Sequence, residues 1–157
     1  MNTSALSEQY RCAYCGGEIS GERVAAALTR GRKPTYCSGH HRAAQNNALS
    51  YLRRHGRENP HVRIDRRSMA FHRLIATKIE TNPGIVARAR DNIDRWSSQG
   101  SQEAYLDEWR RILSGDPREI AQFLRSSGQR ATRLRQSSPF TGVLSREERA
   151  AIMRAYR

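Results

Sequence analysis

Several residue types are scarce in this 157-residue sequence, and each shortage excludes a class of protein. Aromatic residues make up 7%, and no hydrophobic run approaches the roughly 18 residues of a membrane-spanning helix. Three cysteines, an odd number with two close together, favour metal binding in a reducing compartment over a disulfide framework. The segment Met1–Tyr10 has neither a basic region nor a hydrophobic run, so we expect a cytoplasmic protein without membrane contact.

Acidic residues are also scarce relative to basic ones. The sequence has 15 Asp and Glu against 28 Lys and Arg, a formal net charge of +13. An excess of this size creates a surface that attracts polyanions. All the basic residues except Lys33 and Lys78 are arginine. The positive charge therefore has two explanations that fit equally well: a general preference for arginine in this protein's composition, and recognition of phosphate groups.

The cysteines begin with a Cys-x-x-Cys pair, Cys12 and Cys15, followed directly by two glycines. Two thiolates at this spacing can converge on one tetrahedral ion, and Gly16 lets the backbone turn away. A polar, basic turn follows at 29–34, and we expect two short strands to flank it.

The second candidate ligand pair is Cys37 with either His40 or His41. Ser38 is placed to cap a helix that ends at Gly56, so both ligands would lie in its first turn. A helix N-terminus also favours the thiolate form of Cys37. We expect one structural zinc ion bound by Cys12, Cys15, Cys37 and, by register, His41 rather than His40.

This stretch resembles the small treble-clef zinc fingers of actinobacterial proteins, which carry a Cys-x-x-Cys-Gly motif, a basic linker and a Tyr-Cys-Ser motif before a basic helix. The matching positions are Cys12, Cys15, Gly16, Tyr36, Cys37, Ser38 and Arg42. His41 stands where the family has its last cysteine, and imidazole is an accepted zinc ligand. The resemblance covers residues 11–57 and implies a β-hairpin plus a helix.

The sequence contains no recognisable catalytic centre. No glutamate adjoins a candidate ligand histidine, as it does in hydrolytic zinc motifs. A His-hairpin-helix nuclease shares the treble-clef shape but requires a histidine at the end of the hairpin, and residues 21–36 contain none. His55 and His61 lie too late in the chain. We therefore expect a non-catalytic protein, with a metal-dependent nuclease as a less favoured alternative.

Basic residues are concentrated around the finger, where eleven Lys and Arg lie between Arg23 and Arg67 against only two acids. A rigid finger with a basic helix and loop is suited to nucleic-acid phosphates, and we favour DNA over RNA. The candidate contacts are Arg30, Arg32, Lys33, Arg42, Arg53, Arg54, Arg57, Arg66 and Arg67.

The expected fold class is mainly α: a treble-clef-like zinc finger with a basic helix (1–57), a basic linker (58–67) and a bundle of about five helices (68–157). Apolar residues at helical spacing indicate the bundle. Asn82–Pro83 and Asp116–Pro117 each combine a cap with a first-turn proline, and Ser145–Glu148 reads as a capping box. An Arg-rich turn separates the last two helices.

That Arg-rich stretch is a second candidate basic site, because no acid lies between Glu119 and Glu147. Its residues are Arg125, Arg130, Arg133 and Arg135. Residues His72–Ala76, Trp96 and Arg133–Phe140 make this half similar to uncharacterised bacterial helical proteins, often found at toxin–antitoxin-like loci. The resemblance implies a regulatory or antitoxin-like role in which the positive surface binds an acidic partner protein. That role is the alternative to a nucleic-acid-binding accessory protein.

Overall fold

The structure is a computed structural model that describes residues 9–100 and 104–156. Most of the segment Met1–Tyr10 lies outside the described residues. The chain divides into two compact units, unit 1 (Met1–Arg66) and unit 2 (Arg67–Arg157). Among the described residues, no helix has both the length and the apolar character needed to cross a membrane. The expected mainly α fold class is confirmed.

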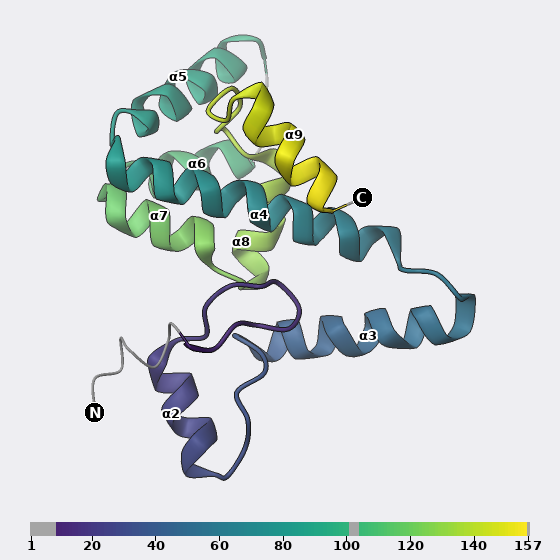
Figure 1. The fold of residues 1–157 in the computed structure, drawn as a ribbon. Helices are drawn as coiled ribbons and strands as arrows, with labels where there is room; N and C mark the ends of the chain where they lie inside the picture. The colour runs from purple at the N-terminus through teal and green to yellow at the C-terminus, as the bar shows by residue number, and fades with distance from the viewer. Residues whose placement is uncertain (1–8, 101–103, 157) are drawn as a thin grey trace. The chain divides into compact units, whose positions relative to one another are not determined.

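Unit 1 contains α2 (Gly21–Thr29), α3 (Gly39–His55) and the first turns of α4 (Pro60–Thr81) (Figure 1). The strand that we expected before the basic turn is wrong, because α2 occupies that segment. Three consecutive alanines are strong helix formers, and Glu22 lies favourably in the first turn. In the described part of this unit, β-pairing is limited to an isolated bridge between Arg11 and Glu18.

The basic helix α3 has the boundaries that the sequence predicts. Ser38 has an extended backbone and its hydroxyl accepts a hydrogen bond from the third helical residue. Gly56 ends the helix with a left-handed φ of 65°, and its N–H donates to the Leu52 carbonyl at 2.8 Å. Both ends are therefore fixed by local chemistry.

The segment 58–67, which we interpreted as a linker, is helical from Pro60 onward. Proline suits the first helical position, and the Asn59 side-chain oxygen accepts a hydrogen bond from the His61 N–H at 3.0 Å. The connection between α3 and α4 is therefore short. Helix α4 begins in unit 1 and ends in unit 2.

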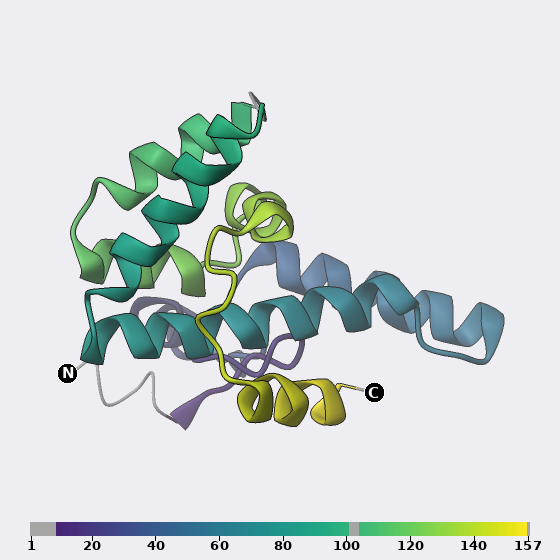
Figure 2. The same ribbon diagram turned by 90° about the horizontal axis from the view of Figure 1, so that it is seen from above.

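Unit 2 places a bundle of helices around one apolar core (Figures 1 and 2). After α4 its elements are α5 (Ile85–Ser98), α6 (Ala104–Leu113), α7 (Pro117–Arg125), α8 (Gln129–Leu134), η1 (Arg135–Ser137) and α9 (Arg146–Ala155). Trp109 is fully buried at the centre, with Phe123 and Phe140 edge-on to its ring. Helix α6 packs against both α5 and α7.

The expected helix starts in unit 2 are confirmed at Asp116, which caps α7, and at Ser145, which forms a capping box with Glu148. The expected Arg-rich turn is instead helical, because α8 and η1 occupy most of it. Leu134 is fully buried and anchors this short helix to the core.

Candidate metal centre

The side chains of Cys12, Cys15, Cys37 and His41 converge, with their ligand atoms all within 4.8 Å of one another. The Sγ atoms of Cys15 and Cys37 are 3.7 Å apart, and Nδ1 of His41 lies 3.7 Å from Cys12 Sγ and 3.1 Å from Cys37 Sγ. Zinc–sulfur bonds of about 2.3 Å give a tetrahedron with edges of about 3.8 Å. The four side chains therefore lie close enough to hold a metal ion, with separations that suit zinc.

The first two ligands are held by a tight backbone loop. The Cys12 N–H donates to the Gly17 carbonyl at 2.7 Å, and the Gly16 N–H donates to the Cys12 carbonyl at 2.8 Å. Gly16 has a φ of 68°, a conformation that side chains other than glycine rarely adopt. Cys12 and Cys15 are both buried, so their thiols face the cluster and not the solvent.

The other two ligands come from the start of α3. Cys37 and His41 are four residues apart and therefore lie on one face of the helix start. The Ser38 hydroxyl accepts a hydrogen bond from the His41 N–H at 3.0 Å, which fixes the first turn. His41 is 1% exposed, whereas His40 is exposed to solvent. The structure thus brings into the cluster His41, the histidine that the sequence register of the motif favours.

The electrostatics of the cluster favour a positive charge at its centre. Hydrogen bonds with Cys15 and Cys37 lower the pKa of the Cys12 thiol far below its usual range, against the opposing effect of burial. Burial works to lower the pKa of His41, but hydrogen bonds with the Cys12 and Cys15 thiols outweigh it and raise that pKa to about 9. Thiolates that are already favoured are the form that binds a metal ion.

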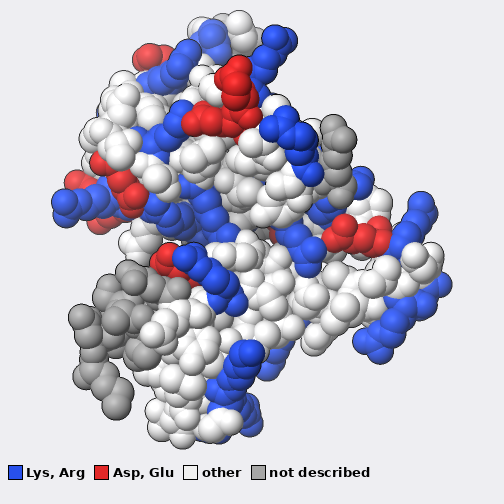
Figure 3. All heavy atoms as spheres, viewed as in Figure 1, with Lys and Arg blue, Asp and Glu red and all other residues white. Residues whose placement is uncertain are grey.

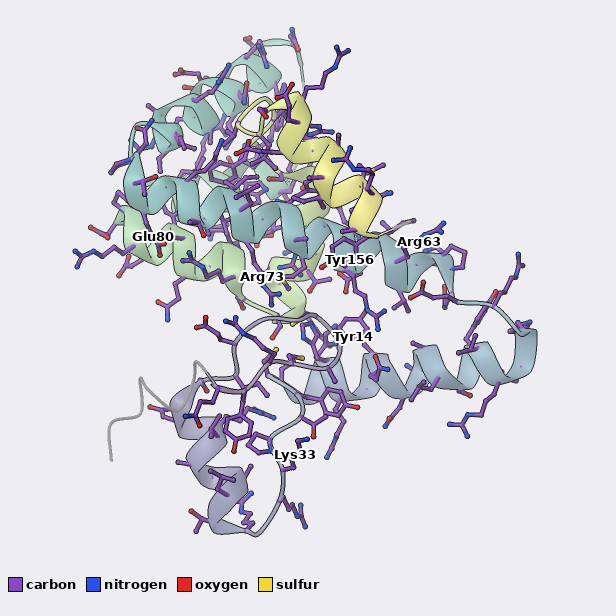
Figure 4. All side chains as sticks on the ribbon, in the orientation of Figure 1. Tyr14, Lys33, Arg63, Arg73, Glu80 and Tyr156 are labelled. Atoms are coloured by element: carbon purple, nitrogen blue, oxygen red, sulfur yellow. The ribbon has the colours of Figure 1, made fainter. Side chains whose placement is uncertain are left out.

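Tyr14 connects the metal-binding loop to α4. Its ring centroid lies 4.8 Å from that of His41, and the Arg66 guanidinium lies 5.0 Å above the same ring. Its hydroxyl donates to Oδ2 of Asp65 at 3.0 Å. In Figure 4 Tyr14 lies beside the sulfur atoms of the loop. The aromatic ring therefore shields one side of the cluster from water.

Seven of the nine predicted nucleic-acid contacts are exposed, and within the described residues none of the seven has a carboxylate partner at ion-pair distance. They are Arg30, Arg32, Lys33, Arg42, Arg53, Arg54 and Arg57. Arg67 is half-buried. Arg66 has internal partners, since its guanidinium donates to Glu58 at 3.1 Å and to the Gln45 side chain at 2.9 Å.

A pocket of about 470 Å³ lies between α2 and the segment that leads into α3. Five cations and no carboxylate line it: Arg23, Arg30, Arg32, Lys33 and Arg42. Figure 4 shows Lys33 on this segment. Sequence reasoning missed Arg23, because it treated this stretch as a strand. Helical spacing would have found it, since Arg23, Ala26, Ala27 and Arg30 repeat at the period of one helix face.

The second predicted basic site is not brought together as an open surface. Arg125 donates to Glu80, at 2.8 Å from Nη2 to Oε2, and Arg130 and Arg133 both pair with Glu108. Arg135 is 4% exposed. Arg125, Arg130 and Arg133 therefore pair with carboxylates that are distant in sequence.

The histidines considered for a nuclease lie apart from the metal cluster. His55 is exposed in the last turn of α3, where its ring lies 4.2 Å from that of Tyr51. His61 is exposed in the first turn of α4.

No family model, curated protein or solved structure matches this chain. The resemblances to treble-clef fingers and to bacterial helical proteins therefore stay predictions. What is established about function is the geometry itself: three cysteines and one histidine, placed to hold a metal ion at the start of a basic helix.

Proposed function

We propose that this protein binds nucleic acid through unit 1, which a structural zinc ion keeps folded, and that it acts as a non-catalytic accessory or regulatory protein. Three thiolates and one imidazole are a donor set typical of structural zinc. Four protein ligands complete the tetrahedron and leave no position for a reactive water. Cys12, Cys15, Cys37 and His41 would hold the ion, and its role is to order unit 1.

The zinc ion has a structural task because unit 1 has a small apolar core. Few hydrophobic side chains are buried among its described residues, and two of them are the ligands Cys12 and Cys15. Domains of this size commonly need a metal or disulfides in addition to their core. The metal would join the loop before α2 to the start of α3, and so fix the basic helix relative to the basic segment at 30–33.

The observation that carries the nucleic-acid proposal is the contrast between the two predicted basic sites. In the second site Arg125, Arg130 and Arg133 pair with carboxylates, whereas the seven exposed cations of the first site have no such partner among the described residues. In Figure 3 basic side chains project at the C-terminal end of α3 and beside α2. Uncompensated cations on a rigid scaffold support phosphate binding.

Fluorescence anisotropy with a labelled 20-nucleotide strand and a 20-base-pair duplex, each as DNA and as RNA, tests the proposal. We expect binding at low salt and an affinity that falls steeply as salt rises, because phosphate contacts release counterions. Substituting Arg53, Arg54 and Arg57 with Gln should weaken binding of every sequence and reduce the salt slope by up to about three. We expect DNA to be preferred.

The matched control replaces three exposed arginines of unit 2: Arg118→Gln, Arg146→Gln and Arg154→Gln. It removes the same charge, so a general effect of net charge would weaken both variants equally. The proposal requires that only the α3 variant loses affinity and salt slope. Failure of every DNA and RNA probe to bind at low salt would overturn it.

A further inference from the structure

We propose that the pocket between α2 and α3 binds the terminal phosphate of a nucleic-acid strand, an inference that rests on the proposed function of unit 1. The surface of α3 would contact backbone phosphates, and the pocket would hold the strand end. The pocket lies within unit 1 and has a volume of about 470 Å³. Ligand pockets commonly start at about 300 Å³, so there is room for a whole nucleotide.

The charge of the pocket exceeds what an internal phosphate needs. Five cationic side chains line it, from α2, from the segment 30–33 and from α3. A phosphodiester carries one negative charge, whereas a phosphomonoester carries about 1.5 to 2 at neutral pH and offers three acceptor oxygens. The lining therefore matches the end group of a strand better than its backbone.

The start of α3 adds donors to the same pocket. Ser38 and Gly39 line it, and the first turn of α3 contains no acid. The Ser38 hydroxyl and carbonyl accept from the N–H groups of His41 and Arg42, and among the described residues no acceptor is found for the N–H groups of Gly39 and His40. The dipole of this 17-residue helix favours negative charge there.

The remaining walls suit a sugar or a base. Ala26 and Ala27 come from one face of α2, Pro34 is buried and Tyr36 is half-buried. Aromatic rings provide a stacking surface that accepts any base. Arg53 and Arg54 lie at the other end of α3, about 21 to 23 Å from Gly39 along the helix axis. A strand that follows α3 from these arginines would reach the pocket with its end.

The test uses anisotropy with three labelled 12-nucleotide DNA strands that carry a 5′-phosphate, a 3′-phosphate or two hydroxyl ends. We expect one phosphorylated strand to bind about tenfold more tightly than the hydroxyl strand, because charge-assisted hydrogen bonds are lost with the phosphate. A mononucleotide with the same phosphate should compete away that advantage and leave binding of the hydroxyl strand unchanged.

Two substitutions at Gly39 identify the pocket as the cause. A Cβ at this position meets nothing within 4 Å, so Gly39→Ala and Gly39→Asp both fit. Asp is favourable at a helix start, so the fold should persist, but its carboxylate repels a phosphate. Gly39→Asp should abolish the advantage of the phosphorylated strand, and Gly39→Ala should keep it.

A charge-matched pair of variants separates the pocket from the helix surface. Arg32→Gln with Lys33→Gln should remove the tenfold advantage, whereas Arg53→Gln with Arg54→Gln should weaken all strands and keep it. Equal affinity of the wild type for the three strands, or a full advantage retained by Gly39→Asp, overturns this inference while leaving nucleic-acid binding intact. Binding of no strand overturns the proposed function as well.

Discussion

The hydroxyl of Tyr14 donates a hydrogen bond to Oδ2 of Asp65 at 3.0 Å and so joins the metal-binding loop to α4. Tyr14 is 5% exposed, and its ring packs against His41. The partner is 51 residues away in sequence. Unit 1 is therefore closed by this polar contact as well as by the four candidate metal ligands.

Tyr14→Phe should destabilise unit 1 by about 1 to 2 kcal/mol, because the half-buried Asp65 carboxylate loses its partner while the ring remains. The measurement is the urea dependence of cysteine reactivity with a thiol reagent, since all three cysteines lie in unit 1. Tyr51→Phe is the control, because no hydrogen bond from its hydroxyl is found in the described part of the chain. Equal urea midpoints for Tyr14→Phe and wild type would contradict this role.

The stability of unit 2 should depend on pH through His72. Its Nδ1–H donates to the Ser68 carbonyl at 2.8 Å, and burial lowers its pKa to about 4. In the unfolded chain the imidazole has an ordinary pKa of 6.5 and binds a proton that the folded state does not. The contribution of His72 to the free energy of unfolding is therefore fully present above pH 7 and is lost as the pH drops from 6.5 toward 4. The loss is about 2 kcal/mol between pH 7 and 5.

Denaturation followed by tryptophan fluorescence measures this loss, because Trp96 and Trp109 both lie in unit 2 and His72 is its only histidine. His72→Asn keeps a donor for the Ser68 carbonyl but does not titrate in this range. The variant should have nearly the same stability at pH 7 and pH 5. A wild type with equal stability at both values would contradict the burial of a neutral imidazole.

Arg135 should be a structural residue of unit 2. It is 4% exposed, and its guanidinium donates to the Ser126 carbonyl at 2.7 Å and to the Thr132 hydroxyl at 2.8 Å. Arg135→Gln should destabilise unit 2 by about 2 to 3 kcal/mol, since hydrogen bonds from a buried charged group are lost. Arg133→Gln on the same segment is exposed and should change stability by less than about 0.5 kcal/mol. Equal effects in thermal unfolding would contradict the assignment.

The candidate metal cluster could be predicted because each half of it is local. Cys12 and Cys15 are joined by a short loop, and Cys37 and His41 are one helical turn apart. Short spacings of this kind determine geometry almost alone. The predicted secondary structure between the two halves was wrong, because we expected a hairpin there although the alanine run indicates a helix, α2. That error also concealed Arg23 from the basic site.

Long-range pairing could not be predicted from the sequence. Glu108 pairs with both Arg130 and Arg133 from a different helix, and Glu80 pairs with Arg125 across 45 residues. Local charge counting therefore predicted an open basic site where the fold supplies carboxylates. In contrast, the start of α4 at Asn59–Pro60 follows the same cap-and-proline signal that correctly identified α7. The signal at Asn59–Pro60 was present in the sequence, but we interpreted this segment as a linker.

Metal content and thiol reactivity, measured on the same sample before and after a chelator, test the central claim most directly. We predict one zinc ion per chain and three thiols that react only after the ion is removed. Removal should lower the helical circular dichroism by the share of unit 1 and leave the tryptophan emission of unit 2 unchanged, since the core of unit 2 is built from its own residues. A metal-free protein with three reactive thiols and the same helical signal before and after chelation would contradict the claim.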